Sequence, residues 1–217
     1  MPGARGARLG PEGKALRAAE QGREDLAAAR AAWRAELAGL DPRRLVFLDE
    51  GGIDTRMTRG WARAPRGRRA TGTVPHGRWE RLTVIGALAL DGVVAAMSVA
   101  AATSAAVFPA FAEQVLAPAL RDRPGAVVVM DNLAAHKAEA VRGALDRAGG
   151  LAHRHLPPHS PDLNPIEPCW PKLKARPRAE AARPREALEA ALGPALAAIT
   201  ARDARGWFRL AGYPAPE

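Results

Sequence analysis

The chain has 217 residues, of which 47% are hydrophobic, so it can bury a core and is not disordered by composition. Its net charge of +9 favours a polyanionic partner, nucleic acid first, with a generally basic surface as the alternative. The single cysteine, Cys169, excludes an internal disulfide and a cysteine zinc site. No apolar run reaches the roughly 20 residues of a membrane span, and no signal peptide is recognisable. We therefore expect a cytoplasmic protein without a membrane partner.

The first half of the chain predicts a helix, a strand and a hairpin. Apolar residues at helical spacing predict a helix over residues 12–40, with Leu26, Trp33, Leu37 and Leu40 on its buried face. The β-rich runs that follow predict strands at residues 44–49, 81–90 and 93–100. Asp91-Gly92 between the last two runs is typical of a tight turn, so these two strands are expected to form a hairpin.

A basic segment separates the first predicted strand from this hairpin. Between its first and last arginine it contains seven arginines and no acid: Arg56, Arg59, Arg63, Arg66, Arg68, Arg69 and Arg78. Its frequent Gly and Pro residues predict a loop with one short strand. The arginines are the best candidates for contacts with DNA phosphates, which would position the DNA without reading its sequence. The alternative is a solvated basic loop.

The second half of the chain alternates helices with strands. Helices are predicted over residues 104–120 and 135–148, and strands over residues 126–131 and 151–156. Three further helices are predicted over residues 165–176, 184–199 and 201–210. This order predicts an α/β fold, in the form of a ribonuclease-H-like mixed five-stranded sheet with helices on both faces.

Three acids follow apolar runs in a way that suggests a metal site. Asp49 and Asp131 each end a predicted strand, and Glu167 follows a proline-rich loop. Mg²⁺ prefers oxygen ligands, and two such ions about 3.5–4 Å apart can stabilise both the attacking and the leaving oxygen of an in-line displacement. We expect the three carboxylates to converge on such a pair of ions.

Each of these acids also has a structural interpretation. Asp49 could simply end its strand, and Glu50 points to the opposite face if that strand continues. Asp131 could belong to a turn or a helix cap. Glu167 could occupy the third position of a helix that Asn164 caps and Pro165 begins.

Two strings of residues carry a resemblance to a known family. The first is Asp131-Asn132-Leu133-Ala134-Ala135-His136, and the second is Pro157-Pro158-His159-Ser160-Pro161-Asp162-Leu163-Asn164-Pro165-Ile166-Glu167, followed by Trp170, Lys172, Leu173 and Lys174. They resemble the catalytic signature of the mariner-superfamily DDE transposases, in particular the bacterial insertion-sequence branch. The 35 residues between Asp131 and Glu167 are close to that group's usual spacing. The region from Asp49 through Trp61 is also similar to the first-aspartate region of that family.

The resemblance implies an Asp–Asp–Glu triad of Asp49, Asp131 and Glu167 that binds two Mg²⁺ ions, for which Mn²⁺ can substitute. In that chemistry water attacks the DNA at the ends of the element, and the freed 3′-hydroxyl then attacks target DNA. It also implies that DNA is contacted by Lys172 and Lys174 in addition to the arginines. The residues expected to support the metal ligands are Asn132, His136 and Asn164.

The resemblance further implies a domain division and partners. Residues 1–42 would be a helical segment left from the linker to a missing helix-turn-helix region, and residues 43–217 the ribonuclease-H-like DDE catalytic domain. The partners would be element ends, target DNA, a second copy in a homodimer, and a separate helix-turn-helix polypeptide, in the nucleoid-associated part of a bacterial cytoplasm. Two alternatives stay open, a catalytically decayed DNA-binding remnant and a metal-dependent nuclease with another role.

Four other residues bear on the site. Pro171 would remove an interior hydrogen bond from a regular helix, at a cost of about 3 kcal/mol or more, which favours the decayed copy. Trp170 is expected to anchor the core. His153 and His155 alternate on a predicted strand without a metal-binding partner, so they are expected to be structural.

Overall fold

The structure is a computed structural model that describes residues 19–37, 39–74, 76, 78–100, 107–132 and 139–216. Its five strands are β1 (Leu45–Asp54), β2 (Arg81–Ala89), β3 (Gly92–Val99), β4 (Val127–Met130) and β5 (Ala152–His155). They form one sheet in the order β3-β2-β1-β4-β5. β1 pairs antiparallel with β2 and parallel with β4, while β2–β3 is antiparallel and β4–β5 is parallel. The predicted mixed five-stranded sheet and the β2–β3 hairpin are confirmed.

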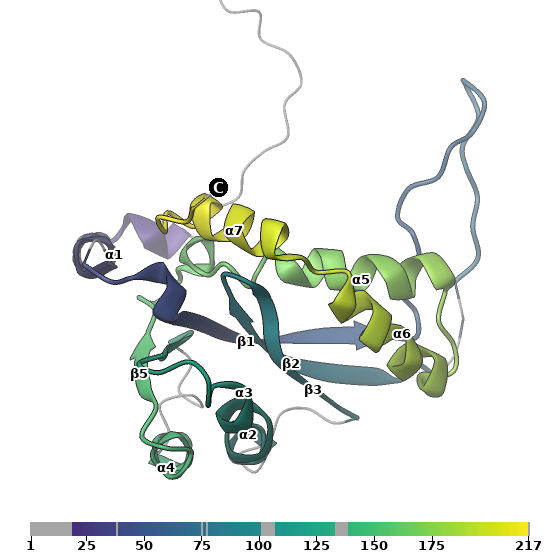
Figure 1. The fold of residues 1–217 in the computed structure, drawn as a ribbon. Helices are drawn as coiled ribbons and strands as arrows, with labels where there is room; N and C mark the ends of the chain where they lie inside the picture. Colours follow the sequence, from purple (N-terminus) through teal and green to yellow (C-terminus); the bar gives the residue numbers. More distant parts are fainter. Residues whose placement is uncertain are drawn as a thin grey trace, which may run out of the picture.

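Helices lie on both faces of this sheet (Figure 1), as predicted. The α-helices are α1 (Glu24–Leu37), α2 (Val107–Phe111), α3 (Ala117–Ala119), α4 (Glu139–Arg147), α5 (Cys169–Glu180), α6 (Arg185–Ala197) and α7 (Ala201–Leu210). The shorter elements are the 3₁₀ turns η1 (Ala19–Gly22), η2 (Pro42–Arg44) and η5 (Pro161–Leu163), and a π-helical turn η3 (Ala112–Leu116) between α2 and α3. No helix in the described ranges is both long enough and apolar enough to cross a bilayer.

Two apolar clusters hold the helices to the sheet, and β1 supplies both of them. Leu45 and Phe47 join the cluster beneath α1, α5, α6 and α7, whereas Val46 and Leu48 join the cluster beneath α2, η3 and α4. This alternation follows from the two-residue period of a strand, which sends successive side chains to opposite faces. A strand that is buried on both faces is rigid, and it fixes the position of the acid that follows, Asp49.

The prediction that the first strand ends at Asp49 is wrong. β1 continues through Gly51 and Gly52 to Asp54, because its antiparallel pairing with β2 extends to the pair Asp54 and Arg81. Glycine is weak in a strand by itself, so the sequence indicated a stop there. In the structure, the missing side chain of Gly51 leaves room for the ring of Trp170, as described below.

The helix after the proline-rich loop begins later than predicted. Residues 165–168 form hydrogen-bonded turns, and α5 begins at Cys169. Pro171 is therefore the third residue of α5, where a backbone N–H has no partner within the helix, so the expected loss of a hydrogen bond does not arise. Pro177 does lie inside α5, and Pro184 occupies the N-cap position of α6. The predicted cap is also absent, because the Asn164 side chain caps no helix.

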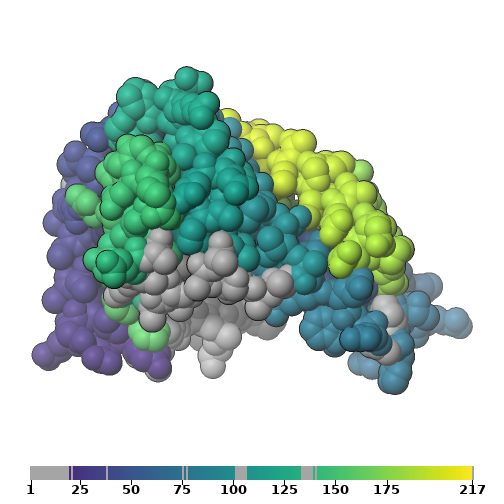
Figure 2. Space-filling model, turned by 90° about the horizontal axis from the view of Figure 1, so that it is seen from below, coloured from purple at the N-terminus to yellow at the C-terminus, as the bar shows by residue number. Residues whose placement is uncertain are grey.

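The arginine-rich segment leaves the sheet between β1 and β2. Its described residues contain no strand, so the prediction of one short strand there is not met. At its base, the Thr55 N–H donates to the Glu80 carbonyl (3.0 Å) and the Glu80 N–H donates to the Thr55 hydroxyl (3.1 Å). Above this base the segment extends away from the sheet in Figure 1, and Figure 2 shows it at the end of the molecule opposite α1.

Candidate functional site

Two of the three predicted acids are neighbours at one end of the sheet. β1 and β4 run parallel, and their register pairs Leu48 with Met130. Asp49 and Asp131 directly follow these two paired residues, so the register of the strands brings the two acids side by side. Both acids are half-buried. The fully buried strands beneath them set this placement, since Val46, Leu48, Val128 and Met130 are all 0–1% exposed.

Trp170 holds the first of these carboxylates. Its indole Nε1 donates a hydrogen bond to Asp49 Oδ2 at 2.9 Å, and its ring is 6% exposed. The ring lies against two glycines that are in neighbouring strands: a Cβ on Gly51 would come within 2.6 Å of it, and a Cβ on Gly86 within 3.1 Å. The predicted role of Trp170 as a core anchor is confirmed, and its hydrogen bond to Asp49 is a role that sequence reasoning missed.

Glu167 lies in the turn before α5, within electrostatic reach of both aspartates. Partial burial raises the pKa of its carboxyl above the ordinary value, and the negative charges of Asp49 and then Asp131 raise that pKa further. The residue keeps substantial solvent exposure, so its carboxylate faces an opening rather than the core. The structure thus brings the three predicted acids together in one electrostatically coupled group. Glu50 is not part of it, because it lies in register with Ile85, which belongs to the opposite cluster.

A cavity of about 300 Å³ opens between Asp131 and Glu167. It is lined by Asp131, Asn132, Leu156, Pro157, Pro158, His159, Ser160, Pro161, Asn164 and Glu167. Two buried amide oxygens of this lining, Asn132 Oδ1 and Asn164 Oδ1, accept no hydrogen bond. Asn164 as a whole is only 3% exposed. A buried acceptor without a donor is costly, so this cavity suits a ligand that supplies donors, such as water molecules held by a cation.

The donor set is chemically suited to a hard divalent cation. The cavity and the adjacent Asp49 offer carboxylate and amide oxygens, which Mg²⁺ and Mn²⁺ accept. Within the described ranges, no three His, Cys, Asp or Glu side chains are close enough to form a ready-made coordination shell. The three acids are therefore gathered by the fold and coupled electrostatically, without being in contact around one point.

The predicted basic residues occupy different surroundings. Lys172 Nζ forms an ion pair with Asp203 Oδ2 at 2.5 Å, which ties α5 to the capped start of α7. Lys174 is half-buried, and its burial, followed by the positive charges of Arg178 and Arg81, lowers its pKa. Of the two, Lys174 is the lysine that acts electrostatically on Glu167.

The arginine-rich segment is held at its base by residues that the sequence reasoning did not single out. The Arg183 Nε donates to the Thr55 carbonyl at 2.7 Å. The Arg56 guanidinium lies over the Trp79 ring, 3.9 Å from its centroid. The other arginines of the segment, Arg59, Arg63, Arg66, Arg68, Arg69 and Arg78, are exposed, as is Trp61 at 92%.

Two histidines of β5, His153 and His155, lie beside β4, the strand that leads to Asp131. His155 Nδ1 lies 3.3 Å from the Asp131 carbonyl oxygen, so this ring contacts the backbone of the site. His153 packs edge-on against the His155 ring, with a centroid distance of 5.9 Å. His136, the predicted neighbour of the metal ligands, lies outside the described residues.

The site lies within the region that matches a known family. The model of the family described as "DDE superfamily endonuclease" matches residues 44–189, about two thirds of the chain. Those bounds include Asp49, Asp131 and Glu167. A comparison with curated protein sequences found no match.

Solved structures of the Mos1 transposase share the fold. Its paired-end complex with the left transposon end matches with a TM-score of 0.71 and 21% identity, covering 96% of this chain and 64% of that one. Its strand transfer complex matches with a TM-score of 0.72 and 22% identity, covering 94% and 63%. The catalytic domain of the Mos1 mariner transposase matches with a TM-score of 0.59 and 19% identity, covering 87% of each chain. This chain thus spans less than two thirds of the longer Mos1 chains.

Proposed function

The chain belongs to the DDE superfamily endonuclease family, and from that membership we propose that it is the catalytic domain of a transposase. The proposed reaction is metal-dependent cleavage of DNA at the ends of an element. The freed 3′-hydroxyl then attacks a phosphodiester of target DNA, which joins the element strand to the target. One observation carries the proposal: Asp49, Asp131 and Glu167 come from three separate elements and converge into one coupled group of carboxylates. A structural cap or strand end would not require that convergence.

We propose Mg²⁺ as the cofactor, as two ions, with Mn²⁺ able to replace it. The oxygen donors of the three acids fit this choice, as do the two unpartnered amide oxygens of Asn132 and Asn164. Mos1 paired-end complexes have been solved with Mg and with Mn. When bound, such ions supply Lewis acidity to the phosphodiester and lower the pKa of water.

This chain's own residues would hold and orient the reacting groups. Asp49 and Asp131 would bind the ions, and Trp170 would hold the Asp49 carboxylate in a fixed direction. Glu167 would complete one site from the opposite wall of the cavity. Asn132 and Asn164 would accept hydrogen bonds from water at that site, which orients the water for attack.

We propose DNA as the partner, held mainly by the arginine-rich segment between β1 and β2. If all seven arginines contact phosphates, the logarithm of affinity should fall with that of salt concentration with a slope of about −6. The triple substitution Arg66→Ala, Arg68→Ala and Arg69→Ala should then make that slope shallower by about 2.7. Fluorescence anisotropy of a labelled duplex across a salt series measures this. An unchanged slope would mean that the segment is a solvated loop.

Several finer assignments belong to the same proposal. They are a bacterial insertion-sequence origin, action as a homodimer on DNA, a separate helix-turn-helix polypeptide for end recognition, and a nucleoid-associated cytoplasmic location. The first rests on the resemblance of the string from Pro157 to Glu167 to that branch, and the second on the need to hold two element ends at once. The +9 charge supports binding to nucleic acid.

The deciding experiment combines nicking and joining. Purified protein would be incubated with a supercoiled plasmid and a labelled duplex that carries free 3′-hydroxyl ends, in Mg²⁺, Mn²⁺ or EDTA. Metal-dependent nicks and joined label that vanish in Asp131→Ala, but persist in a control with the exposed Asp122→Ala, are the expected result. Nicking without joining would indicate a nuclease with another role. DNA binding with neither product would indicate a catalytically decayed remnant.

A further inference from the structure

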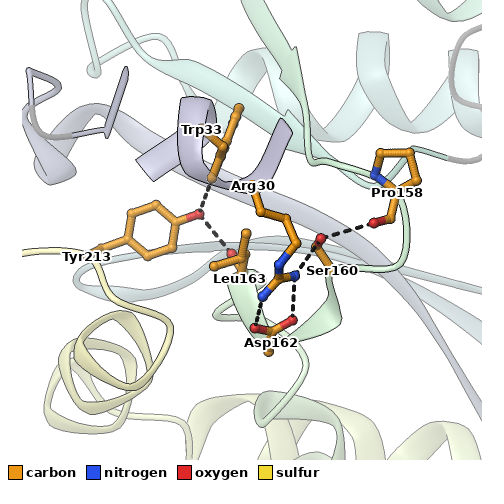
Figure 3. A network of polar contacts seen from close by, with 7 residues as sticks. All are labelled: Arg30, Trp33, Pro158, Ser160, Asp162, Leu163 and Tyr213. Atoms are coloured by element: carbon orange, nitrogen blue, oxygen red, sulfur yellow. Dashed lines mark hydrogen bonds and ion pairs between the residues drawn. The ribbon is translucent and has the colours of Figure 1, made fainter. Parts of the chain in front are cut away.

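A buried arginine in α1 reaches the loop that carries Glu167. Arg30 is 8% exposed, and its Nη1 donates to Ser160 Oγ (2.7 Å) and to Asp162 Oδ1 (2.9 Å). Its Nη2 donates to Asp162 Oδ2 at 2.5 Å, so the guanidinium holds the carboxylate with both of its terminal nitrogens (Figure 3). A planar guanidinium bound in this two-pronged way fixes orientation as well as distance.

The same helix holds the other end of η5 through the C-terminal segment. Trp33 lies one helical turn after Arg30, and its Nε1 donates to the Tyr213 hydroxyl at 3.1 Å. That hydroxyl donates in turn to the Leu163 carbonyl at 2.8 Å (Figure 3). Tyr213 is 2% exposed, and burial raises its pKa, so the phenol keeps the proton that it donates. Arg30 and Tyr213 thus hold η5 from both sides.

The loop has little regular structure of its own. His159 has φ of 54°, in the left-handed region that is unfavourable for a residue with a side chain, and the Ser160 hydroxyl bridges back to the Pro158 carbonyl at 3.0 Å. From η5 the chain reaches Glu167 through consecutive turns. In these turns the Asn164 N–H donates to the Pro161 carbonyl, and the Glu167 N–H donates to the Asn164 carbonyl. A shift of η5 is therefore passed along the backbone to Glu167.

We propose that Arg30 and Tyr213 are positioning residues that set the place of Glu167, and through it the affinity of the site for a divalent cation. This inference rests on the proposed function of the carboxylate group. Both residues lie outside the part of the chain that matches the family model. The competing explanation is that burial of Leu163 and Ile166 alone holds the loop, in which case Arg30 contributes only to stability.

The test compares Arg30→Lys and Ser160→Ala with a matched control, Arg23→Lys. Arg23, immediately before α1, also holds a carboxylate with two nitrogens, since its Nε and Nη2 donate to the two oxygens of the exposed Asp25, and it makes no contact with the loop in these hydrogen bonds. Ser160→Ala removes one hydroxyl while Arg30 keeps its carboxylate partner, so this variant is expected to fold. The free Mn²⁺ signal in electron paramagnetic resonance gives the dissociation constant, and single-turnover plasmid nicking gives the rate constant, well below each melting temperature.

Loss of a group that is hydrogen-bonded to a metal ligand typically costs roughly 10- to 100-fold in metal affinity. Arg30 acts on Glu167 only through the loop, so Arg30→Lys is expected to weaken Mn²⁺ binding by less than that range, and Ser160→Ala by less again. The nicking rate should fall while the dissociation constant for DNA stays unchanged, a split that a general loss of stability does not produce. Mn²⁺ affinity equal to that of Arg23→Lys, with only a lower melting temperature, would overturn the proposal and leave the proposed function intact.

The behaviour of the wild-type protein shows whether the proposed function, rather than the role of Arg30, has failed. If the wild-type protein binds Mn²⁺ but does not nick DNA, the proposed function fails and the Mn²⁺ comparison still decides the role of Arg30. If the wild-type protein binds no Mn²⁺, amide hydrogen exchange at Asn164, Ile166 and Glu167 decides whether Arg30 fixes the loop. Faster exchange in Arg30→Lys and Ser160→Ala than in Arg23→Lys supports the positioning role, and equal exchange overturns it.

Discussion

The two walls of the carboxylate site are built in different ways. Asp49 lies inside β1, where the ladder to β2 and the buried residues below it fix the backbone, and the Trp170 indole N–H donates a hydrogen bond to its side chain. Glu167 lies in a run of turns that no strand supports, and polar contacts from Arg30 and Tyr213 hold the preceding loop. The strand wall is fixed by continuous backbone pairing, whereas the loop wall depends on a few side chains from both ends of the chain.

This difference indicates where the site can adjust. A sheet that is packed on both faces resists displacement, since any shift must break several hydrogen bonds and reopen the core. A loop that is held by a few polar contacts can move by breaking one or two of them. We therefore expect substitutions at the strand wall to affect cation affinity strongly, because packing and the Trp170 hydrogen bond fix Asp49 itself. Substitutions at the loop wall should affect cation affinity less, because they act on Glu167 only through the backbone of the loop. The following predictions test this contrast in order of expected effect.

The largest effect is expected where the strand wall is tightest. Gly51→Ala would place a Cβ 2.6 Å from the Trp170 ring, so the ring or the strand must shift, which disturbs the hydrogen bond from Trp170 to Asp49. Such overpacking costs about 1–3 kcal/mol, and we expect that loss in the free energy of unfolding together with a loss of Mn²⁺ binding. Urea unfolding and Mn²⁺ titration measure the two effects.

A second glycine provides the control for this substitution. Gly206 lies inside α7 with open space around the position that a Cβ would occupy, so Gly206→Ala should stabilise the protein by up to about 1 kcal/mol. The two substitutions are chemically identical and should have opposite signs. If Gly51→Ala proves as harmless as Gly206→Ala, the strand wall is less rigid than its contacts indicate.

The next effect separates packing from hydrogen bonding at Trp170. Trp170→Phe keeps an aromatic ring over Gly51 but removes the Nε1 donor to Asp49, so cation affinity is expected to fall roughly 10- to 100-fold. Trp207→Phe in α7, where Trp207 packs partly buried against the same cluster, is the matched control. Both variants should lose some stability from the smaller ring. Equal cation affinity in the two variants would contradict a role for the indole N–H.

The sequence predicted which strands form the strand wall, but it did not predict how far β1 extends. Apolar alternation and the Asp91-Gly92 turn were enough to place the hairpin, and the apolar runs before the two aspartates placed Asp49 on a strand and Asp131 at the end of one. The continuation of β1 through Gly51 was not predictable, because glycine alone disfavours a strand. Only the position of Trp170, which is far away in the sequence, explains why a glycine is needed there.

The loop wall was predicted as a motif, without the contacts that hold it. The string from Pro157 to Glu167 identified the family-like site, but nothing in it indicates its partners. Arg30 contacts Asp162 across 132 positions, and Tyr213 contacts Leu163 across 50. A single sequence has no periodicity that links such distant residues. Local spacing also misplaced the start of α5, because hydrogen-bonded turns around the buried Ile166 stand where the first helical turn was expected.

A smaller effect on cation affinity is expected from the loop wall at Tyr213. Tyr213→Phe leaves the Leu163 carbonyl and the Trp33 indole N–H without their shared partner, which costs about 1–3 kcal/mol of the free energy of unfolding. Because the loop loses one of its two holds, Mn²⁺ affinity should fall as well. Trp33→Phe removes the donor to Tyr213 and makes a buried ring smaller, but it keeps the hydrogen bond from Tyr213 to the Leu163 carbonyl, so it should leave Mn²⁺ affinity closer to wild type. A larger loss of affinity in Trp33→Phe would show that α1 acts on the loop by another route.

The smallest effect is a pH dependence of stability in the metal-free protein. The pKa of Glu167 is raised by partial burial and by Asp49 and Asp131, so the folded state binds this proton more tightly than the unfolded state. Unfolding free energy should therefore fall as the pH rises from the unfolded pKa through the raised folded pKa. Glu167→Gln lacks this titration, so its free energy of unfolding should rise relative to that of wild type as the pH passes between these two pKa values. The difference should then remain at higher pH.

Mg²⁺ should reverse that order, because only the wild-type carboxylate group keeps all three acids to bind the cation, and binding to the folded state stabilises it. Urea unfolding in EDTA and in Mg²⁺ across the pH series measures both effects, with the exposed Glu186→Gln in α6 as the control. A stability difference between wild type and Glu167→Gln that stays constant with pH would mean that the loop wall does not bring Glu167 into the field of the two strand aspartates. The two walls would then be independent, and the carboxylates would not form one site.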